Sequence, residues 1–238
     1  MAHPPPGAFG ATLPLRGRDK KVQRFFDDAV EFMPILLLGV QLTIVVTIGS
    51  LLLSTVLGLI WALMRVSGIR VLSGIAVVVV NVIRGIPIIV QLFYIYFVLP
   101  DFGITLTALQ AAIIGLGIAY SAYQAENFRA GIEAIDRGQV EAAHSLGMGW
   151  ALTMRRVVLP QAVRIVLPPY GNIMIMMLKD SSQASTITVG ELALQGMLIA
   201  SSTFKNTTVF TLVAALYLVM SVPLIVLVGR LEKRFGRK

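Results

Sequence analysis

Long stretches without a formal charge constrain this sequence more than any other feature. Residues 34–64 are thirty-one predominantly apolar positions with no Asp, Glu, Lys or Arg. A helix needs about 20 apolar residues to cross the ~30 Å hydrocarbon core of a bilayer, so this stretch is long enough to span one. The whole chain is 56% hydrophobic and only 13% charged, which a soluble domain of this length is not. We therefore predict an all-α membrane protein.

Four further stretches of this kind follow, each with at most one charge. They complete a prediction of five core transmembrane helices, at about residues 34–64, 71–99, 102–125, 157–178 and 206–229. The membrane domain would cover 34–229, between an amino-terminal segment, 1–33, and a basic tail, 230–238. The amino-terminal segment lacks the apolar core of a cleaved signal peptide. Within it, residues 19–33 could form an amphipathic helix lying on the membrane.

A polar island, residues 138–160, separates the third and fourth spans. Three apolar side chains recur in it at helical spacing: Val140, Ala143 and Leu146. Gly147 and Gly149 allow positive φ angles, so the chain can end one short helix and turn into a second. We predict a helix-turn-helix with one face left to meet a partner.

The same island resembles the signature of importer permeases of the ATP-binding cassette (ABC) superfamily, which reads Glu-Ala-Ala, three residues, Gly, nine residues, Ile-x-Leu-Pro. The matching positions are Glu141, Ala142, Ala143, Gly147, Leu159 and Pro160. Val157 stands where the pattern prefers Ile. The segments IRGIPIIVQLFYIYF before the island and LPPYGN and LKDSS after it resemble the subfamily that imports polar amino acids. The resemblance covers about residues 34–229, and it implies that the island is a cytoplasmic coupling region that docks on a separate ATPase subunit.

The resemblance implies an assembly of several chains in a bacterial inner membrane. Its partners would be ABC ATPase subunits that use ATP and Mg, a second copy of the permease or a paralogue, an extracytoplasmic amino-acid-binding protein, and membrane lipid. The sequence contains no G-x-x-x-x-G-K-[ST] motif, so we expect ATP hydrolysis in a partner chain and no cofactor on this one. It has no cysteine, and no catalytic or metal-binding set stands out. The chain is therefore interpreted as non-catalytic.

The basic residues set the predicted orientation. Placing the island in the cytoplasm puts twelve Lys and Arg on that side and seven outside, as the positive-inside tendency requires. The net charge of +8 therefore indicates orientation rather than nucleic-acid binding. Five of the outer seven lie in residues 16–24, against the tendency. A sixth span at 181–204 would remove this conflict, but the stretch is polar, so we favour a short helix that lies at the outer face or re-enters against protein.

Polar residues inside or beside spans mark a candidate pathway for the transported solute. They are Arg84 in the second span and Lys179, Asp180, Ser181 and Gln183 after the fourth. Gly85 and Pro87 predict a break in the second span, which would leave Arg84 either at the pathway or at a protein interface. Lys179 and Asp180 could bind an amino acid, although mutual pairing at the outer boundary is the favoured interpretation.

Other residues are interpreted as structural. Pro168 and Pro169 predict a second kink, in the fourth span. A salt bridge is predicted between Glu126 and Arg129, which are three residues apart on one helix. Three glycines of the first span would let another helix approach closely, either from this chain or from a second copy: Gly39, Gly49 and Gly58.

These observations predict a permease subunit that moves a polar amino acid by alternating access, driven by a separate ATPase. The first alternative is an ABC importer for another small solute, which would keep the island and change the pathway residues. The second is a channel or membrane scaffold that works without ATP. The helix-turn-helix argues against the second alternative.

Overall fold

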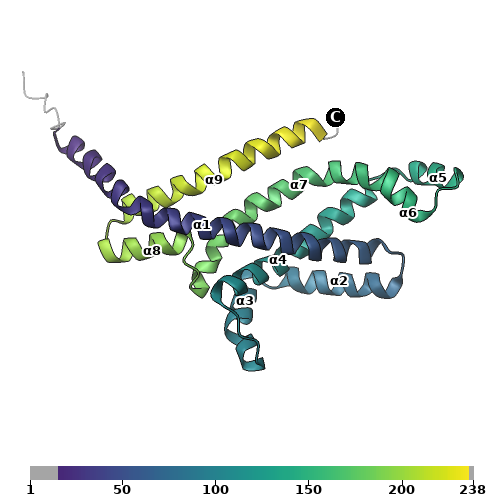
Figure 1. Ribbon diagram of the computed structural model, residues 1–238, viewed down its shortest axis with the longest axis horizontal. Coiled ribbons are helices and arrows are strands. Elements are labelled where there is room, and N and C mark those ends of the chain that lie inside the picture. Colours follow the sequence, from purple (N-terminus) through teal and green to yellow (C-terminus); the bar gives the residue numbers. More distant parts are fainter. Residues whose placement is uncertain (1–15, 236–238) are drawn as a thin grey trace, which may run out of the picture.

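A computed structural model describes residues 16–235, and every regular element among them is helical (Figure 1). In chain order the elements are α1 (Arg16–Val66), α2 (Arg70–Gly85), α3 (Ile88–Phe93), the π-helical η1 (Tyr94–Val98), the 3-10 helix η2 (Leu99–Phe102), α4 (Ala108–Glu133), α5 (Arg137–Ser145), α6 (Trp150–Thr153), the π-helical η3 (Met154–Val158), α7 (Leu159–Asp180), the 3-10 helix η4 (Ser181–Ile187), α8 (Leu192–Thr203) and α9 (Asn206–Phe235). The predicted all-α fold is confirmed, and helices occupy each of the five predicted spans.

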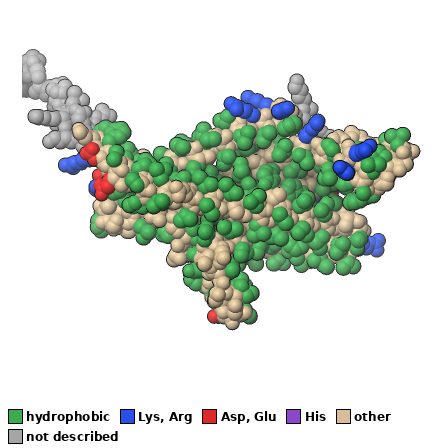
Figure 2. Space-filling model, viewed as in Figure 1, with side chains coloured by type: hydrophobic (Ala, Val, Ile, Leu, Met, Phe, Trp, Pro, Cys, Tyr) green, Lys and Arg blue, Asp and Glu red, His purple; other side chains and the backbone are tan. Residues whose placement is uncertain are grey.

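The long helices differ in how clearly they suit a bilayer. Among the described residues, α1 over Val22–Val66 and α9 are long and apolar enough to cross a membrane, and the bent pair of α2 with Ile88–Phe102 would make a third span. The helices α4 and α7 have 26 and 22 residues, or about 39 and 33 Å at 1.5 Å per residue, but they are less apolar. Hydrophobic side chains cover most of the face shown in Figure 2, and Lys and Arg side chains lie along its upper edge and at both ends.

The first helix is continuous over 51 residues, a length of about 77 Å. It passes Pro34 without ending, so the structure has no helix boundary between residues 33 and 34, where the sequence predicted one. Residues 19–33 are helical, but as the first part of α1 rather than as a separate amphipathic helix. Phe32 is buried against side chains of α8 and α9. Residues 1–15 of the predicted amino-terminal segment lie outside the described residues.

The predicted break in the second span is confirmed. The helix α2 ends at Gly85, Pro87 precedes α3, and the chain bends by 98° between α2 and the segment from α3 to η2. Pro87 has no N–H to donate to the carbonyl of Ile83. The side-chain amide of Gln91 replaces it, donating to the carbonyl oxygens of Ile83 and Ile86 at 2.8 and 2.9 Å. The segment from α3 to η2 projects on one side of the molecule (Figure 1), and Leu92 and Ile95 pack it against α4.

The two prolines of the fourth span do not end a helix. The helix α7 continues through Pro168 and Pro169 as far as Asp180, and the kink predicted at these residues stays a prediction. The glycine that follows has a packing role, because a Cβ added at Gly171 would lie 2.4 Å from Cγ2 of Val228 on α9. This stretch of α7 is therefore a site of close helix packing.

Residues 181–204 form two short elements instead of a sixth span. The helix α8 has 12 residues, about 18 Å, which is well short of the ~30 Å of a bilayer core. Thr188 follows η4 and Phe204 follows α8, both with left-handed backbones at φ of 65° and 58°. The short helix favoured by the sequence is present, and it lies at the opposite end of the molecule from α5 and α6 (Figure 1).

The three glycines of α1 serve packing within the chain. A Cβ at Gly58 would lie 2.6 Å from Cβ of Gln124 on α4, and one at Gly39 would lie 2.8 Å from the backbone of α8. At Gly49 an added Cβ would lie 3.0 Å from the side chain of Ile113 on α4. Real Cβ atoms do not approach so closely without displacing a neighbour, so α1 can sit where it does because these positions lack side chains.

We expect Gly58→Leu to destabilise the purified chain, because leucine has no room between α1 and α4. Overpacking costs about 1–3 kcal/mol, which corresponds to a fall of roughly 2–12 °C in the melting temperature of a chain of this size. Thermal unfolding in detergent measures the effect. Gly229→Leu on α9 is the matched control, since an added Cβ there meets nothing within 4 Å; equal shifts in the two variants would contradict the packing role.

Candidate functional site

The predicted turn between two short helices is present, with the hydrogen bonds of a glycine-ended helix. Gly147 has a φ of 77°. The N–H of Met148 donates to the carbonyl of Ala143 at 3.1 Å, and the N–H of Gly147 donates to the carbonyl of His144 at 2.9 Å, which is the Schellman pattern. Gly149 has a φ of −67° and a ψ of 164°. The turn therefore uses the left-handed region at Gly147 but not at Gly149.

The tip of the molecule, defined here as residues 137–153 from α5 to α6, exposes apolar side chains. Leu146 is 82% exposed and Trp150 is 63% exposed, whereas Ala143 is buried. The sequence grouped Leu146 with Ala143 by helical spacing, but Leu146 follows the last residue of α5 and points outward. Large apolar side chains that stand in a polar surface are typical of protein interaction sites, so the tip is suited to docking.

The six residues predicted for docking fall into two groups. Four belong to α5 and the turn after it: Glu141, Ala142, Ala143 and Gly147. The other two begin α7, beyond η3: Leu159 and Pro160. Leu159 lines an apolar groove of about 340 Å³ between α1, α4 and α7. The predicted coupling region thus consists of an exposed tip and the start of a long helix, and the docking role of its residues stays a prediction.

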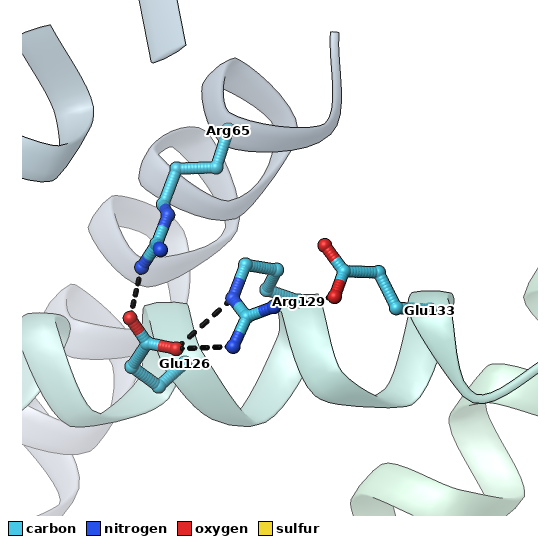
Figure 3. Close-up of polar contacts among 4 residues, drawn as sticks. All are labelled: Arg65, Glu126, Arg129 and Glu133. Carbon is cyan, nitrogen blue, oxygen red and sulfur yellow. Dashed lines mark hydrogen bonds and ion pairs between the residues drawn. The ribbon is translucent and has the colours of Figure 1, made fainter. Parts of the chain in front are cut away.

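An ion network joins α1 to α4 just before the tip (Figure 3). Glu126 lies at its centre, bonded by Arg65 at the end of α1 and by Arg129 one turn along α4. The two bonds from Arg129 to Glu126 measure 2.8 and 3.0 Å, and Arg129 also pairs with Glu133. The predicted salt bridge between Glu126 and Arg129 is confirmed, but it is part of a larger network whose other two members the sequence did not reveal.

The network keeps Glu126 ionised. Burial raises the pKa of the Glu126 carboxyl group, but the hydrogen bonds from Arg129 and Arg65 outweigh burial, and its pKa lies below the ordinary value. Helical spacing alone indicated the partnership with Arg129. Arg65 lies 61 positions away, and no local pattern could have paired it with Glu126.

Two tyrosines of α4 connect the separate parts of the predicted pathway set. The guanidinium of Arg84 lies 5.6 Å from the ring centroid of Tyr123, within the range of a cation–π contact. The rings of Tyr123 and Tyr120 lie 5.8 Å apart. The hydroxyl of Tyr120 donates to Asp180 at 2.6 Å. Tyr123 and Tyr120 thus link Arg84 to Asp180. The sequence interpretation missed both tyrosines. Their spacing of three positions, which places them on one helix face, was the signal that could have indicated them.

The predicted pairing of Lys179 with Asp180 does not occur. Asp180 bonds to Tyr120 instead, and Lys179 is exposed. Ser181 is buried and donates to the carbonyl of Leu178 at 2.7 Å, so its hydroxyl serves the end of α7. Gln183 lies in η4 and is partly buried. Within the described part of the chain, no three His, Asp or Glu side chains gather as a metal site would need.

A buried carboxylate fixes the short helix α8. Glu191 is fully buried and accepts hydrogen bonds from the N–H groups of Ala193 and Leu194, each at 2.9 Å, which caps α8. The hydroxyl of Tyr217 on α9 donates to it at 2.9 Å. The hydroxyl oxygen of Thr43 on α1 accepts from the backbone N–H of Leu192 at 3.2 Å. In the sequence, Glu191 stands out as the single charge of residues 181–204. Its contacts with Thr43 on α1 and Tyr217 on α9 could not be predicted from the sequence.

The sequence of this chain is similar to those of known membrane transport proteins. Residues 54–237 match the family model described as "Binding-protein-dependent transport system inner membrane component". A relative from Bacillus subtilis (strain 168), the probable amino-acid ABC transporter permease protein YckA, is 37% identical over 208 residues, which are 87% of this chain and 92% of that protein. The L-cystine transport system permease protein TcyB of the same organism is 38% identical over 207 residues, covering 87% and 88%.

Solved structures show the same fold. A crystal structure of an amino acid ABC transporter with histidines superimposes with a TM-score of 0.82 at 39% identity, covering 88% of this chain and 98% of the other. An inward-facing structure of the MetNI methionine ABC transporter gives a TM-score of 0.73 at 24% identity, covering 86% and 98%. The second similarity is one of fold alone.

Proposed function

The chain belongs to the family of binding-protein-dependent transport system inner membrane components, and from this premise we propose that it is the transmembrane permease subunit of an ATP-driven ABC importer for a polar amino acid. Its relatives include permease proteins of arginine and L-cystine transport systems and a probable glutamine ABC transporter permease protein. They support the class of amino acids rather than one member of it. The membrane would be the inner membrane of a bacterial cell.

The exposed tip carries this proposal. Leu146 and Trp150 stand out from it, and burying them against a partner would release about 1.5–3 kcal/mol for each side chain that becomes fully covered. The chain has no phosphate-binding G-x-x-x-x-G-K-[ST] motif. The proposed partner is therefore an ATPase subunit, which would bind ATP and Mg and receive the tip in a groove.

The position of the tip suits the transmission of movement. The helix α4 leads directly into α5, and α6 continues through η3 into α7, so a partner that moves the tip acts on two long helices at once. The ion network around Glu126 extends this connection to α1. If the ATPase pair contacts the tip differently in its open and closed states, it would bias the long helices between inward-facing and outward-facing arrangements.

The proposed pathway runs beside α4. Arg84, Tyr123, Tyr120 and Asp180 provide a cation, two aromatic rings and a carboxylate in succession, and these groups could interact with the ionic ends of an amino acid. Uptake into reconstituted vesicles tests the substrate class. Radiolabelled amino acids are compared with unrelated small solutes, and uptake of the latter alone would favour an importer for another small solute.

The main test is purification of the chain from its native membrane in mild detergent, with mass spectrometry of the bound chains. We expect an ATPase subunit to remain bound, and Leu146→Asp to reduce its recovery about tenfold or more, because a charge at the centre of an apolar contact costs at least ~1.4 kcal/mol. Ile69→Asp is the matched control, an exposed apolar residue in another turn. Recovery of the wild-type chain alone would favour a channel or scaffold.

Cysteine labelling tests the proposed orientation. The sequence has no cysteine, so Ser202→Cys on α8 and Ser145→Cys on α5 each give one thiol, and both positions are exposed. A membrane-impermeant maleimide added to intact cells is expected to label position 202, whereas position 145 reacts only after the membrane is opened. The reverse pattern would overturn the orientation.

A further inference from the structure

A groove with two arginines lies where the first helix turns into the second. It has a volume of about 540 Å³, and its lining combines Arg65 and Arg70 with small residues and valines. The turn between α1 and α2 lies at the same end of the molecule as the tip (Figure 1), and Figure 2 shows Lys or Arg side chains at that end. In the proposed orientation the groove opens toward the cytoplasmic leaflet.

The polar end of the groove is positively charged. The guanidinium of Arg65 already bonds to Glu126, whereas Arg70 is exposed and has no ion pair among the described residues. No side chain caps the first turn of α2. The N–H groups of that turn and the positive end of the helix dipole therefore add to the positive charge of Arg70. This end of the groove is complementary to an anion.

The other end of the groove is apolar and open. An added Cβ at Gly74 would meet nothing within 4 Å, so the missing side chain leaves the wall of α2 free. Val78 is 62% exposed beside it, and Val77 also lines the groove. A polar end beside an apolar wall, at the end of a membrane-spanning helix, fits a molecule with an anionic head and an apolar chain.

We propose that this groove binds an anionic phospholipid. The phosphate would lie at Arg70, Arg65 and the first turn of α2, and an acyl chain would follow Gly74 and Val78. Basic pockets between membrane helices on the cytoplasmic side are suited to anionic headgroups. A free phosphate has no apolar part, so it would leave the wall formed by Gly74, Val77 and Val78 uncovered. A second copy docked groove to groove would bring like charges together.

The test is native mass spectrometry of the assembled complex taken from vesicles of equal phosphatidylglycerol and phosphatidylcholine. We expect bound phosphatidylglycerol to be enriched on the wild-type complex. Arg70→Gln is expected to weaken its binding about fivefold, the usual effect of one basic residue near an anionic surface. Gly74→Leu fills the apolar wall and is expected to weaken binding independently. Arg65 is left unchanged because it belongs to the ion network.

Gly229→Leu and Arg230→Gln on α9 are the matched controls, because Gly229 has open space around it and Arg230 is exposed. Both are expected to retain the bound lipid. Loss of phosphatidylglycerol from the controls to the same extent, or no preference by the wild type, would overturn the proposal. Displacement of the lipid by millimolar inorganic phosphate would make the groove a free-anion site instead. The proposal rests on the orientation given with the proposed function, but lipid retention is measured without transport, so failure to retain lipid and failure to transport are distinguishable.

Discussion

Gly147→Val is expected to abolish uptake while leaving the chain in the membrane. The φ of 77° at this position is nearly inaccessible to a β-branched residue. The turn would have to rearrange, and with it the two Schellman hydrogen bonds that end α5. Strain of this kind costs about 1–3 kcal/mol even where the fold enforces it. Leu146 beside the turn is 82% exposed and a Cβ added at Gly147 would meet nothing within 4 Å, so little packing holds the strained turn in place.

Three measurements on the same membranes report the effects of Gly147→Val. The amount of inserted chain reports folding, the ATPase recovered with it reports docking, and amino-acid uptake reports coupling. We expect the first to be nearly unchanged and the other two to fall about tenfold or more. Gly147→Asn should retain more activity than Gly147→Val, since asparagine enters the left-handed region at lower cost.

Gly149 provides an internal control two residues away. Its φ of −67° and ψ of 164° suit any L residue, and an added Cβ meets nothing within 4 Å. Gly149→Val is therefore expected to keep most of the uptake and of the bound ATPase. If the two valine variants behave alike, the backbone conformation of the turn is not what the tip requires.

Glu126→Arg is expected to have the second largest effect, because it places three guanidinium groups together at the junction of α1 and α4. Removing the central carboxylate alone leaves Arg65 without its partner, and the added charge turns attraction into repulsion. The three side chains are 20–28% exposed, so solvent reduces the penalty, and we expect a loss of about 1–3 kcal/mol in stability. Thermal unfolding in detergent measures it.

A charge exchange identifies the pair responsible. Arg65→Glu combined with Glu126→Arg restores the link between α1 and α4, so the double variant should recover part of the lost melting temperature and of the uptake. Glu133→Arg is the control, because Glu133 is more exposed and pairs only within α4. If the double variant is no more stable than Glu126→Arg, the ion pair between Arg65 and Glu126 does not contribute to stability.

The network also predicts a response to pH. The pKa of Glu126 is lowered by its arginine partners, so its contribution to stability is complete at neutral pH and is lost only as the pH falls below the ordinary range of a glutamic acid. The difference in melting temperature between wild type and Glu126→Gln should therefore be constant around neutrality and shrink under acid conditions.

The sequence predicted the local features of the fold well. The break before α3 follows from Gly85 and Pro87, and the turn after α5 follows from Gly147, since each residue acts on the backbone at its own position. The same reasoning predicted a kink at Pro168 and Pro169, which lie inside α7 without ending it. It also placed a boundary near Pro34, where α1 continues and packs against α8 and α9.

By itself, then, the sequence determined that the chain is an all-helical membrane protein with a broken second span and a helix-turn-helix between two long helices. Apolar length, glycine and proline carry this information, and they act within a few residues. Only the tertiary structure decided three pairings. Gly58 packs against α4 of the same chain, Arg65 forms an ion pair with Glu126, and Asp180 accepts a hydrogen bond from Tyr120 instead of pairing with Lys179. Such pairs depend on the rotation and axial register of whole helices, which the packing of all of them sets together.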